Sequence, residues 1–503
     1  LNTDQISGNF DYAIFDIENN FRFGFENAIA ELYQPNNFVY SYLDDGSTEN
    51  PFLTKQISNH VGTNLESDDE LSAFYLKNKF NIEFFSEDDY IDIGFSSSFK
   101  ERTSKQNKYF LAYRSGAGLT PDTDMTADIE TVYNEEVRTD IDYDDRALII
   151  GTLSQPKDYF DAEVDETNFY LSTLLKPTKS IEFLFGGRQV DLTQTIYQYV
   201  EDRDNPDFSL RRLVQKVPTV LSINDFYPSA SLKYKFNKNN HLDFAYTKTY
   251  IMPDLREASD GIYTHPYDVA DIMGNPNLVN TDIENFDLKY SHYFSDTENI
   301  KTGLFYKDLD KPIEDVMKPS SSLPIYSFDN ADNAVLYGIE FDGRKKLSFI
   351  YHKLINYFIS GNLSYTKSDV TLRKEQESTY TNNHRELQGL SKIVINISLS
   401  YERKDRSATL SYNKMGERIR KVGMIDYDGG EGELPSMYPD YMEDPAAVVD
   451  FVWIEKLDFG MGLKVKFGNI LDKETVWFQG SKDNVTNRFK KGRTFSVSAS
   501  YRY

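Results

Sequence analysis

Tight turns and long polar connections alternate along this sequence. The turns are short polar segments such as SEDD (86–89), NKNN (237–240) and SDTE (295–298). The long connections cover about 113–165, 199–225, 254–283, 317–334, 371–390, 423–445 and 479–492. In an antiparallel meander, such alternation puts every long connection at the same end of the sheet. A soluble sandwich or propeller has no reason for this separation, whereas outer-membrane barrels combine short periplasmic turns with long extracellular loops.

The segments between these connections have the period-two hydrophobicity of strands. In SASLKYKF (229–236), for example, Tyr234 and Phe236 lie on the face opposite Lys233 and Lys235. Segments of this kind lie at about 71–85, 90–112, 166–176, 180–198, 226–236, 241–253, 284–294, 299–316, 335–350, 354–370, 391–401, 407–422, 446–457, 461–478 and 494–503, and a further one lies within 21–43. About 16 strands are therefore recognisable by their periodicity.

The amino-acid composition fits a barrel that spans a membrane. No run of 18 apolar residues occurs, which excludes a membrane-spanning helix. Aromatic residues make up 15% of the chain, with 36 Tyr and 35 Phe, although the sequence is polar on average. A barrel combines these properties, because only alternate residues of each strand face lipid. No linker divides the chain, so we predict one all-β domain over 1–503, a transmembrane antiparallel up-and-down β-barrel.

The chain ends in the strand RTFSVSASYRY (493–503). One face of this strand carries the apolar and aromatic residues Phe495, Val497, Ala499, Tyr501 and Tyr503. A membrane barrel has no free edge, because lipid cannot satisfy unpaired backbone groups. We therefore predict that this strand closes the barrel and that its terminal aromatic residue is an assembly signal for the barrel-assembly machinery. An edge strand of a soluble β-protein is the alternative.

Several classes of function find no support in the sequence. A formal net charge of -25 argues against nucleic acid as a partner, since phosphate-binding surfaces need clustered Lys and Arg. The chain has no Cys, and the motifs G-x-S-x-G, H-E-x-x-H and G-x-x-x-x-G-K-[ST] are absent. His384, in NNHRE (382–386), is expected to be solvated and not catalytic. We therefore predict no enzymatic activity and no cofactor.

One acidic loop is a candidate calcium site. Asp426, Asp428, Glu431 and Glu433 lie in the glycine-rich segment DYDGGEGE (426–433), and Ca²⁺ prefers carboxylate oxygens as ligands. The spacing does not follow an EF-hand, because Gly430 replaces the third ligand and Glu431 the glycine. We therefore expect a solvated acidic loop and no metal site, with calcium as the alternative.

Basic residues on the predicted inner face are a second candidate site. Lys233, Lys235, Lys464, Lys466 and Arg502 could guide anionic cargo or contact a plug. Their ordinary role is to keep a wet barrel wall polar, and this is the role that we expect.

An ordered set of motifs resembles the TonB-dependent receptor family of Gram-negative outer membranes. The motifs are YTKTYIMPDLREAS (246–259), GNPNL (274–278), ENFDLKYSHYF (284–294), GLFYKDLDKPIED (303–315), NADNAVLYGIEFDGRKKL (330–347), LQGLSKIVINISLSYE (387–402), GNILDK (468–473) and the closing strand. The resemblance spans about residues 160 to 503, and residues 1–160 match only in their strand pattern. It implies a 22-stranded barrel filled by an N-terminal plug. We expect that plug, and roughly the first six strands, to belong to the parent protein outside these 503 residues; a genuine 16-stranded barrel is the rival.

The resemblance also implies a function and a set of partners. It implies energy-coupled uptake of a scarce nutrient through the outer membrane, with the TonB complex acting through the missing plug and the long loops extracellular. Expected partners are outer-membrane lipid, a small nutrient or oligomer, and an envelope lipoprotein. A passive porin or structural barrel in a larger envelope complex is the second candidate function. A secreted β-rich enzyme or glycan-binding protein is the third.

Overall fold

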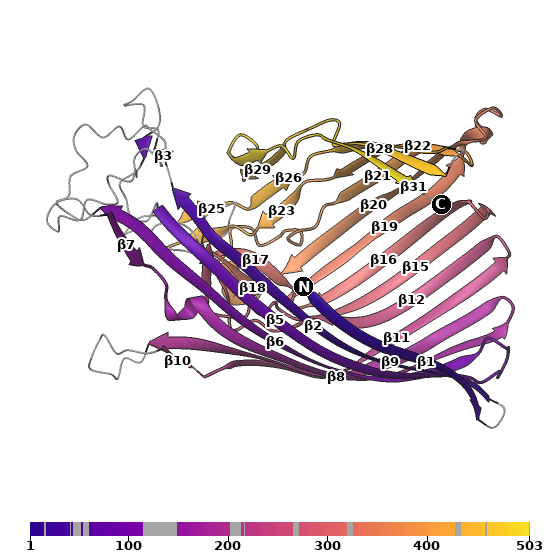
Figure 1. Cartoon of the computed structure of the whole chain (residues 1–503), viewed down its shortest axis with the longest axis horizontal. Coiled ribbons are helices and arrows are strands. Elements are labelled where there is room, and N and C mark those ends of the chain that lie inside the picture. The colour runs from indigo at the N-terminus through magenta and orange to yellow at the C-terminus, as the bar shows by residue number, and fades with distance from the viewer. Residues whose placement is uncertain are drawn as a thin grey trace.

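The computed structural model describes most of the chain. The described residues are 1–14, 17–40, 42–43, 52–53, 60–113, 148–201, 213–215, 217–264, 271–318, 325–427, 434–457 and 460–501. They form an almost entirely β structure, dominated by one curved sheet (Figure 1). No helix in this part of the chain is long and apolar enough to span a membrane.

The curved sheet is a wall of antiparallel strands, each hydrogen-bonded to the next long strand along the chain. The wall strands are β1 (Asn2–Ile14), β2 (Ile17–Tyr40), β5 (His60–Asn81), β6 (Tyr90–Tyr113), β8 (Tyr159–Thr178), β9 (Ile181–Glu201), β11 (Thr219–Asn237), β12 (Asn240–Ile251), β15 (Thr281–Ser295), β16 (Glu298–Asp310), β19 (Asn333–Lys346), β20 (Tyr357–Thr371), β21 (Ile393–Glu402), β22 (Arg406–Met415), β27 (Val448–Lys456), β28 (Met461–Gly468) and β31 (Thr494–Tyr501). Among the described residues no ladder joins β1 to β31, so this wall is not closed. The predicted antiparallel up-and-down order is confirmed.

The connections divide between the two ends of the wall as predicted (Figure 1). The short turns lie at one end, where the turn between β19 and β20 contains the 3-10 helix η4 (Leu347–Phe349). The long connections lie at the other end and carry β3 (Tyr42–Leu43), β4 (Phe52–Leu53), β7 (Leu148–Thr152), β10 (Leu213–Gln215), β13 (Ile262–Thr264), β14 (Asp271–Met273), β17 (Ile313–Lys318), β18 (Ile325–Asn330), β23 (Arg418–Lys421), β24 (Met424–Asp426), β25 (Ser436–Tyr438), β26 (Tyr441–Asp444), β29 (Thr475–Gln479) and β30 (Val485–Phe489), with η2 (Pro156–Asp158) and α3 (Lys374–Glu377).

Three predicted strands were too long. The segments 299–316, 407–422 and 461–478 each contain the end of a wall strand and the start of a separate strand in a long loop. The wall strand β16 ends where Lys311 takes a left-handed backbone with φ of 52°, and β28 is followed by Asn469, also with φ of 52°. Such residues turn the chain out of the ladder, although the hydrophobic alternation continues beyond them.

Large apolar side chains on the outer face of the wall remain exposed. Phe169, Phe226 and Leu304 are 55%, 56% and 52% exposed. The alternation predicted for residues 229–236 is confirmed, because Tyr234 and Phe236 are exposed whereas Lys233 and Lys235 form ion pairs on the opposite face. An exposed apolar band of this kind is the surface that a barrel presents to lipid. The buried apolar clusters lie instead at the long-loop end.

Candidate functional site

Long loops fold inward at one end of the wall and bury an apolar cluster against it. We call the hairpin β17–β18, the segment 372–392 and the strands β23–β26 the loop cap. Its main apolar cluster joins residues of the wall to residues of the loops: Leu309, Ala334, Leu336 and Val370 from the wall, and Val316, Tyr380, Ile419 and Val422 from the cap. Leu336 is buried while its neighbour Tyr337 is 49% exposed on the outer face. The cap therefore packs on the inner face of the wall.

The motif MPDLREAS (252–259) forms a compact turn beneath the cap. Leu255 and Ala258 pack on Phe160, Ala162 and Ile196 of the wall. The backbone N–H of Ala258 donates to the Asp254 carbonyl at 3.0 Å, and burial raises the pKa of the Glu257 carboxyl. These packing contacts with the wall, and not a long hydrophobic run in the sequence, stabilise the turn.

Close packing explains why the motif GNPNL (274–278) begins with a glycine, Gly274. A Cβ at this position would lie 2.2 Å from the carbonyl oxygen of Ser259 and 2.6 Å from that of Arg256. Only glycine permits such an approach of two backbones. The contact is fixed by the N–H of Asn275, which donates to the Glu257 carbonyl at 2.6 Å. Two motifs that are separate in the sequence thus form one packing unit.

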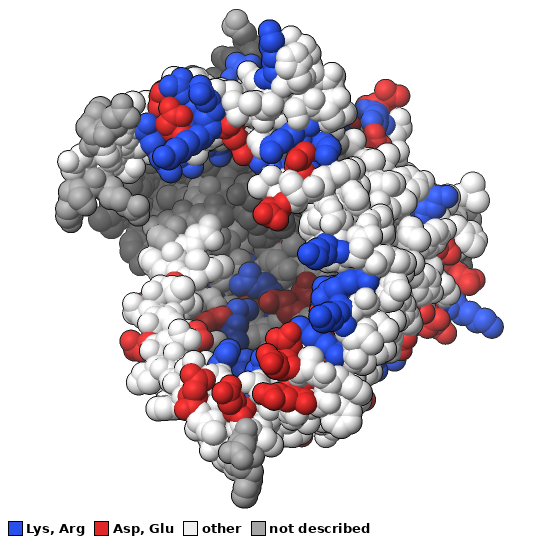
Figure 2. Space-filling model, turned by 90° about the vertical axis from the view of Figure 1, so that its right-hand side faces the viewer, with Lys and Arg blue, Asp and Glu red and all other residues white. Residues whose placement is uncertain are grey.

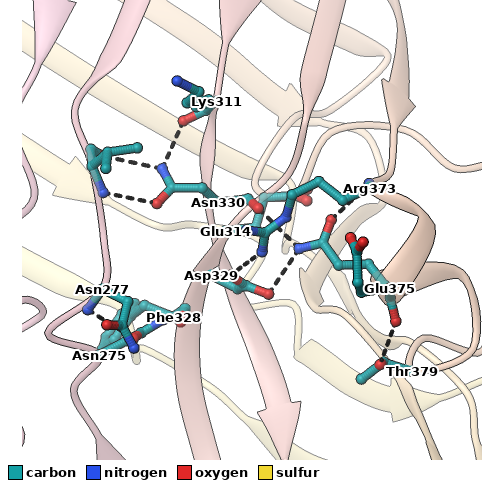
Figure 3. A network of polar contacts seen from close by, with 12 residues as sticks. Asn275, Asn277, Lys311, Glu314, Phe328, Asp329, Asn330, Arg373, Glu375 and Thr379 are labelled. Atoms are coloured by element: carbon teal, nitrogen blue, oxygen red, sulfur yellow. Dashed lines mark hydrogen bonds and ion pairs between the residues drawn. The ribbon is translucent and has the colours of Figure 1, made fainter.

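Two asparagines connect this unit to the cap (Figure 3). The Asn275 side chain donates to the carbonyl of Phe328 at 2.9 Å. The Asn330 amide donates to the carbonyls of Val279 at 3.0 Å and Lys311 at 2.8 Å, and its oxygen accepts from the Val279 N–H at 3.0 Å. Asn330 is 5% exposed, so these bonds satisfy backbone groups that water does not reach.

Asp329 is the centre of a second polar network (Figure 3). Its carboxylate accepts hydrogen bonds from Arg373, Gln376 and Tyr380, each at 2.8 Å. Burial and the Asp329 charge raise the pKa of the Tyr380 phenol, which therefore remains a donor. These bonds hold α3 and its flanking residues on the hairpin β17–β18.

A buried ion pair fixes the cap more deeply. The Nη1 and Nη2 atoms of Arg385 each lie 2.6 Å from a carboxylate oxygen of Glu314, and the two side chains are 1% and 2% exposed. The Gln388 N–H also donates to Glu314 at 3.3 Å. His384 is exposed, as expected from the sequence, whereas the burial of its neighbour Arg385 was not predicted. Nothing in a polar loop marks one arginine as buried.

The inner wall is polar toward the tight-turn end. Figure 2 looks into this end and shows a hollow opening with basic and acidic side chains around it. Lys235 pairs with Glu182, and the Lys233 ammonium lies 3.5 Å from Asp243. Farther round the wall are the pairs Lys301–Asp342 at 3.4 Å and Arg344–Glu402 at 2.7 Å. The paired charges support the expected role of the lysines in keeping the wall polar.

The predicted closing strand lies at the edge of the wall. In β31, Phe495, Val497 and Tyr501 are 63%, 55% and 67% exposed, and they pair in register with Phe467, Val465 and Met461 of β28. Ala499 is also exposed, opposite Leu463. Tyr503 and Arg502 lie outside the described residues. The role of this strand as an assembly signal stays a prediction.

The candidate calcium ligands are only partly described. Asp426 ends β24, whereas Asp428, Glu431 and Glu433 lie outside the described residues. Within the described part of the chain, no group of three or more Asp, Glu or His side chains is arranged to hold a metal ion.

The wall matches a known family of proteins. The sequence model of the family described as TonB dependent receptor-like, beta-barrel, matches residues 1–450. The chain belongs to the TonB-dependent receptor family. The resemblance noted in the motifs is therefore confirmed, and the match reaches the first strands, where the sequence showed only a strand pattern. These receptors are β-barrels of the outer membrane. No curated protein matches the chain in sequence.

Solved structures share the fold of this chain at low sequence identity. The copper transporter OprC superimposes with a TM-score of 0.59 at 12% identity, and the ferric-catecholate import receptor Fiu from E. coli K12 with 0.55 at 13%. The pyoverdine outer membrane receptor FpvA from Pseudomonas aeruginosa PAO1 gives 0.54 at 13%. The matches cover 99%, 99% and 100% of this chain, but only 65%, 63% and 61% of the other three.

Proposed function

We propose that this chain is the barrel of a receptor that imports a scarce nutrient through the outer membrane with energy supplied by TonB. The loop cap carries the proposal, because a folded structure packed inside one end of the wall suits capture of a ligand and obstructs free diffusion. The named neighbours support it, since they are an import receptor, an outer membrane receptor bound to pyoverdine and a copper transporter. In this proposal a plug outside these 503 residues occupies the interior and couples the barrel to TonB.

A passive porin or a structural barrel in an envelope complex is the second candidate. The hollow opening at the tight-turn end favours it (Figure 2). The two candidates differ in their need for energy, because a porin conducts without the inner-membrane proton gradient.

Uptake in cells separates the two. A strain that lacks this protein should lose import of one nutrient from a panel of ferric siderophores, ferric citrate, copper and oligosaccharides. In the parent strain, that import should stop when a protonophore collapses the proton gradient. Import that persists with the protonophore would establish the passive porin.

We also propose that the long-loop end faces the cell exterior. His384 lies exposed in the cap and Lys238 lies exposed in the tight turn after β11. A membrane-impermeant maleimide applied to whole cells should label His384→Cys and leave Lys238→Cys unlabelled until the outer membrane is opened. None of the 503 residues is Cys, so this chain contributes no background. The reverse labelling would invert the topology.

A further inference from the structure

One connection at the tight-turn end differs from its neighbours. Residues 347–356 join β19 to β20 and fold into a short coil, visible between those strands in Figure 1. The Ile350 N–H donates to the Leu347 carbonyl at 3.0 Å, and the Leu354 N–H to the Tyr351 carbonyl at 2.9 Å. The coil is thus a folded element and not a minimal turn.

The coil presents large apolar side chains to its surroundings. Phe349, Ile350, Tyr351 and Ile355 are 64%, 68%, 48% and 59% exposed. Four such side chains in ten residues form an apolar tip that water solvates poorly. The tip is continuous with the outer face of the wall, where the rings of Tyr357 and Tyr401 lie 5.0 Å apart.

Basic residues outnumber acidic ones around the apolar tip, although Glu402 and Asp405 flank Arg403 and Lys404 and pair with Arg344 and Arg406. Lys345 and Lys346 precede it and share Glu298, at 3.3 and 4.0 Å. Lys353 lies within the coil, and Arg403 and Lys404 lie in the next turn, which the Glu402 N–H joins to the Asn356 carbonyl at 2.8 Å. Within the described part of the chain, Lys353, Arg403 and Lys404 form no ion pair and are exposed.

The turn 82–89 at the same end of the wall differs from the coil in charge. It also has an apolar tip, because Phe84 and Phe85 are 71% and 52% exposed. Its own charged side chains include the acidic Glu83, Glu87 and Asp88, of which Asp88 pairs with Lys176 at 2.8 Å. The two tips therefore present the same apolar character to the membrane surface with opposite charge.

We propose that the coil 347–356 anchors this end of the barrel in the adjoining lipid leaflet and binds anionic phospholipid there. The apolar tip enters the layer between headgroups and acyl chains, where aromatic residues concentrate. Lys353, Arg403 and Lys404 then contact lipid phosphates, as basic residues beside a membrane anchor do. The inference needs the barrel to span a membrane, and it does not need transport.

Lipid-specific quenching tests the anchor. The protein carrying a fluorophore on His352→Cys is reconstituted in phosphatidylcholine vesicles in which either phosphatidylglycerol or a matched fraction of the phosphatidylcholine is spin-labelled. The quenching should show that phosphatidylglycerol is enriched at the tip by at least about fivefold, which is the factor that a single Lys or Arg contributes near an anionic membrane surface. A fluorophore on Lys238→Cys should report water in both mixtures.

Charge reversal provides the decisive comparison. Lys353→Glu, Arg403→Glu and Lys404→Glu together should abolish the preference for phosphatidylglycerol, whereas Lys238→Glu should keep it; heat-modifiable migration shows that each variant is folded. Equal quenching by the two lipids would overturn the anionic site. Absence of quenching would show that the tip lies in water and would overturn the anchor. A tip signal that depends on protein concentration would show that a second copy of the chain covers the tip, and would overturn it as well. None of these readings depends on nutrient uptake, so failure of the proposed transport function would leave them unchanged.

Discussion

Replacing Arg385 by alanine is expected to open the loop cap while the wall stays folded. The substitution leaves the Glu314 carboxylate buried without its partner, which costs about 3–5 kcal/mol in comparable buried pairs. The pair joins β17 to the segment 372–392, so the loss falls on the cap and not on the ladders of the wall. Limited proteolysis of outer membranes should cut Arg385→Ala within the cap under conditions that leave the parent protein intact.

Arg373→Ala is the matched control. Its guanidinium also pairs with a carboxylate, that of Asp329 at 2.8 Å, but the Arg373 side chain is 46% exposed. Exposed pairs contribute about 0–1 kcal/mol, so this variant should resist the protease nearly as well as the parent. Replacing Glu314 and Arg385 together by methionine should restore much of the resistance, since an apolar pair leaves no unpaired charge. Equal cleavage of the two alanine variants would show that the buried pair does not hold the cap.

Asp89→Ala is expected to destabilise the tight-turn end by at least about 3 kcal/mol, because several buried donors lose their acceptor. Asp89 is fully buried and accepts from the N–H groups of Phe85 at 2.5 Å, Ser86 at 3.0 Å and Lys176 at 2.7 Å. The last bond ties the turn to β8. Urea unfolding in detergent, followed by heat-modifiable migration, measures the loss. Asp88→Ala removes a neighbouring carboxylate that is 70% exposed and should change little.

The same experiment has a defined pH dependence. Burial raises the pKa of Asp89, but hydrogen bonds from Phe85, Lys176 and Ser86 outweigh it and lower the pKa below its usual value. A lowered folded-state pKa adds stability that is complete above the unfolded pKa of about 3.9 and disappears as pH falls through the folded value. The difference between the parent protein and Asp89→Ala should therefore narrow below about pH 4. A difference that stays constant down to pH 2 would contradict this account of the carboxylate.

The wall could be predicted because the sequence of each strand reflects what its two faces contact. Lipid on one side and water on the other impose alternation on every strand, as Tyr234 and Lys235 show. The prediction missed β1, where Gly8 interrupts the alternation of Ile6 and Phe10. A Cβ on Gly8 would lie 2.3 Å from the ring of Phe23 in β2, so the glycine makes room for an aromatic ring on the neighbouring strand. The sequence of β1 alone does not show that an aromatic ring of β2 lies beside Gly8.

The cap could not be predicted, because its structure depends on contacts between distant loops. The family motifs marked Asn330 in the cap and Gly274 in the packing unit that Asn275 connects to the cap. Arg385 and Asp329 acquire their roles only when β17, β18 and α3 come together. No local pattern distinguishes Arg385 from the exposed Arg373, since burial here is a property of the assembled loops.

The separation of wall and cap has a consequence for the order of folding. Wall ladders join neighbours along the chain, and short loops close rapidly because little chain entropy is lost. Contacts at the long-loop end instead join Glu314 to Arg385 within the cap, 71 residues apart, and Lys108 of β6 to the Ile262 carbonyl of β13, 154 residues apart. Such contacts gain little until the hairpins that carry them stand side by side. The wall should therefore assemble hairpin by hairpin, and the cap should condense last, on a surface that only the finished wall provides.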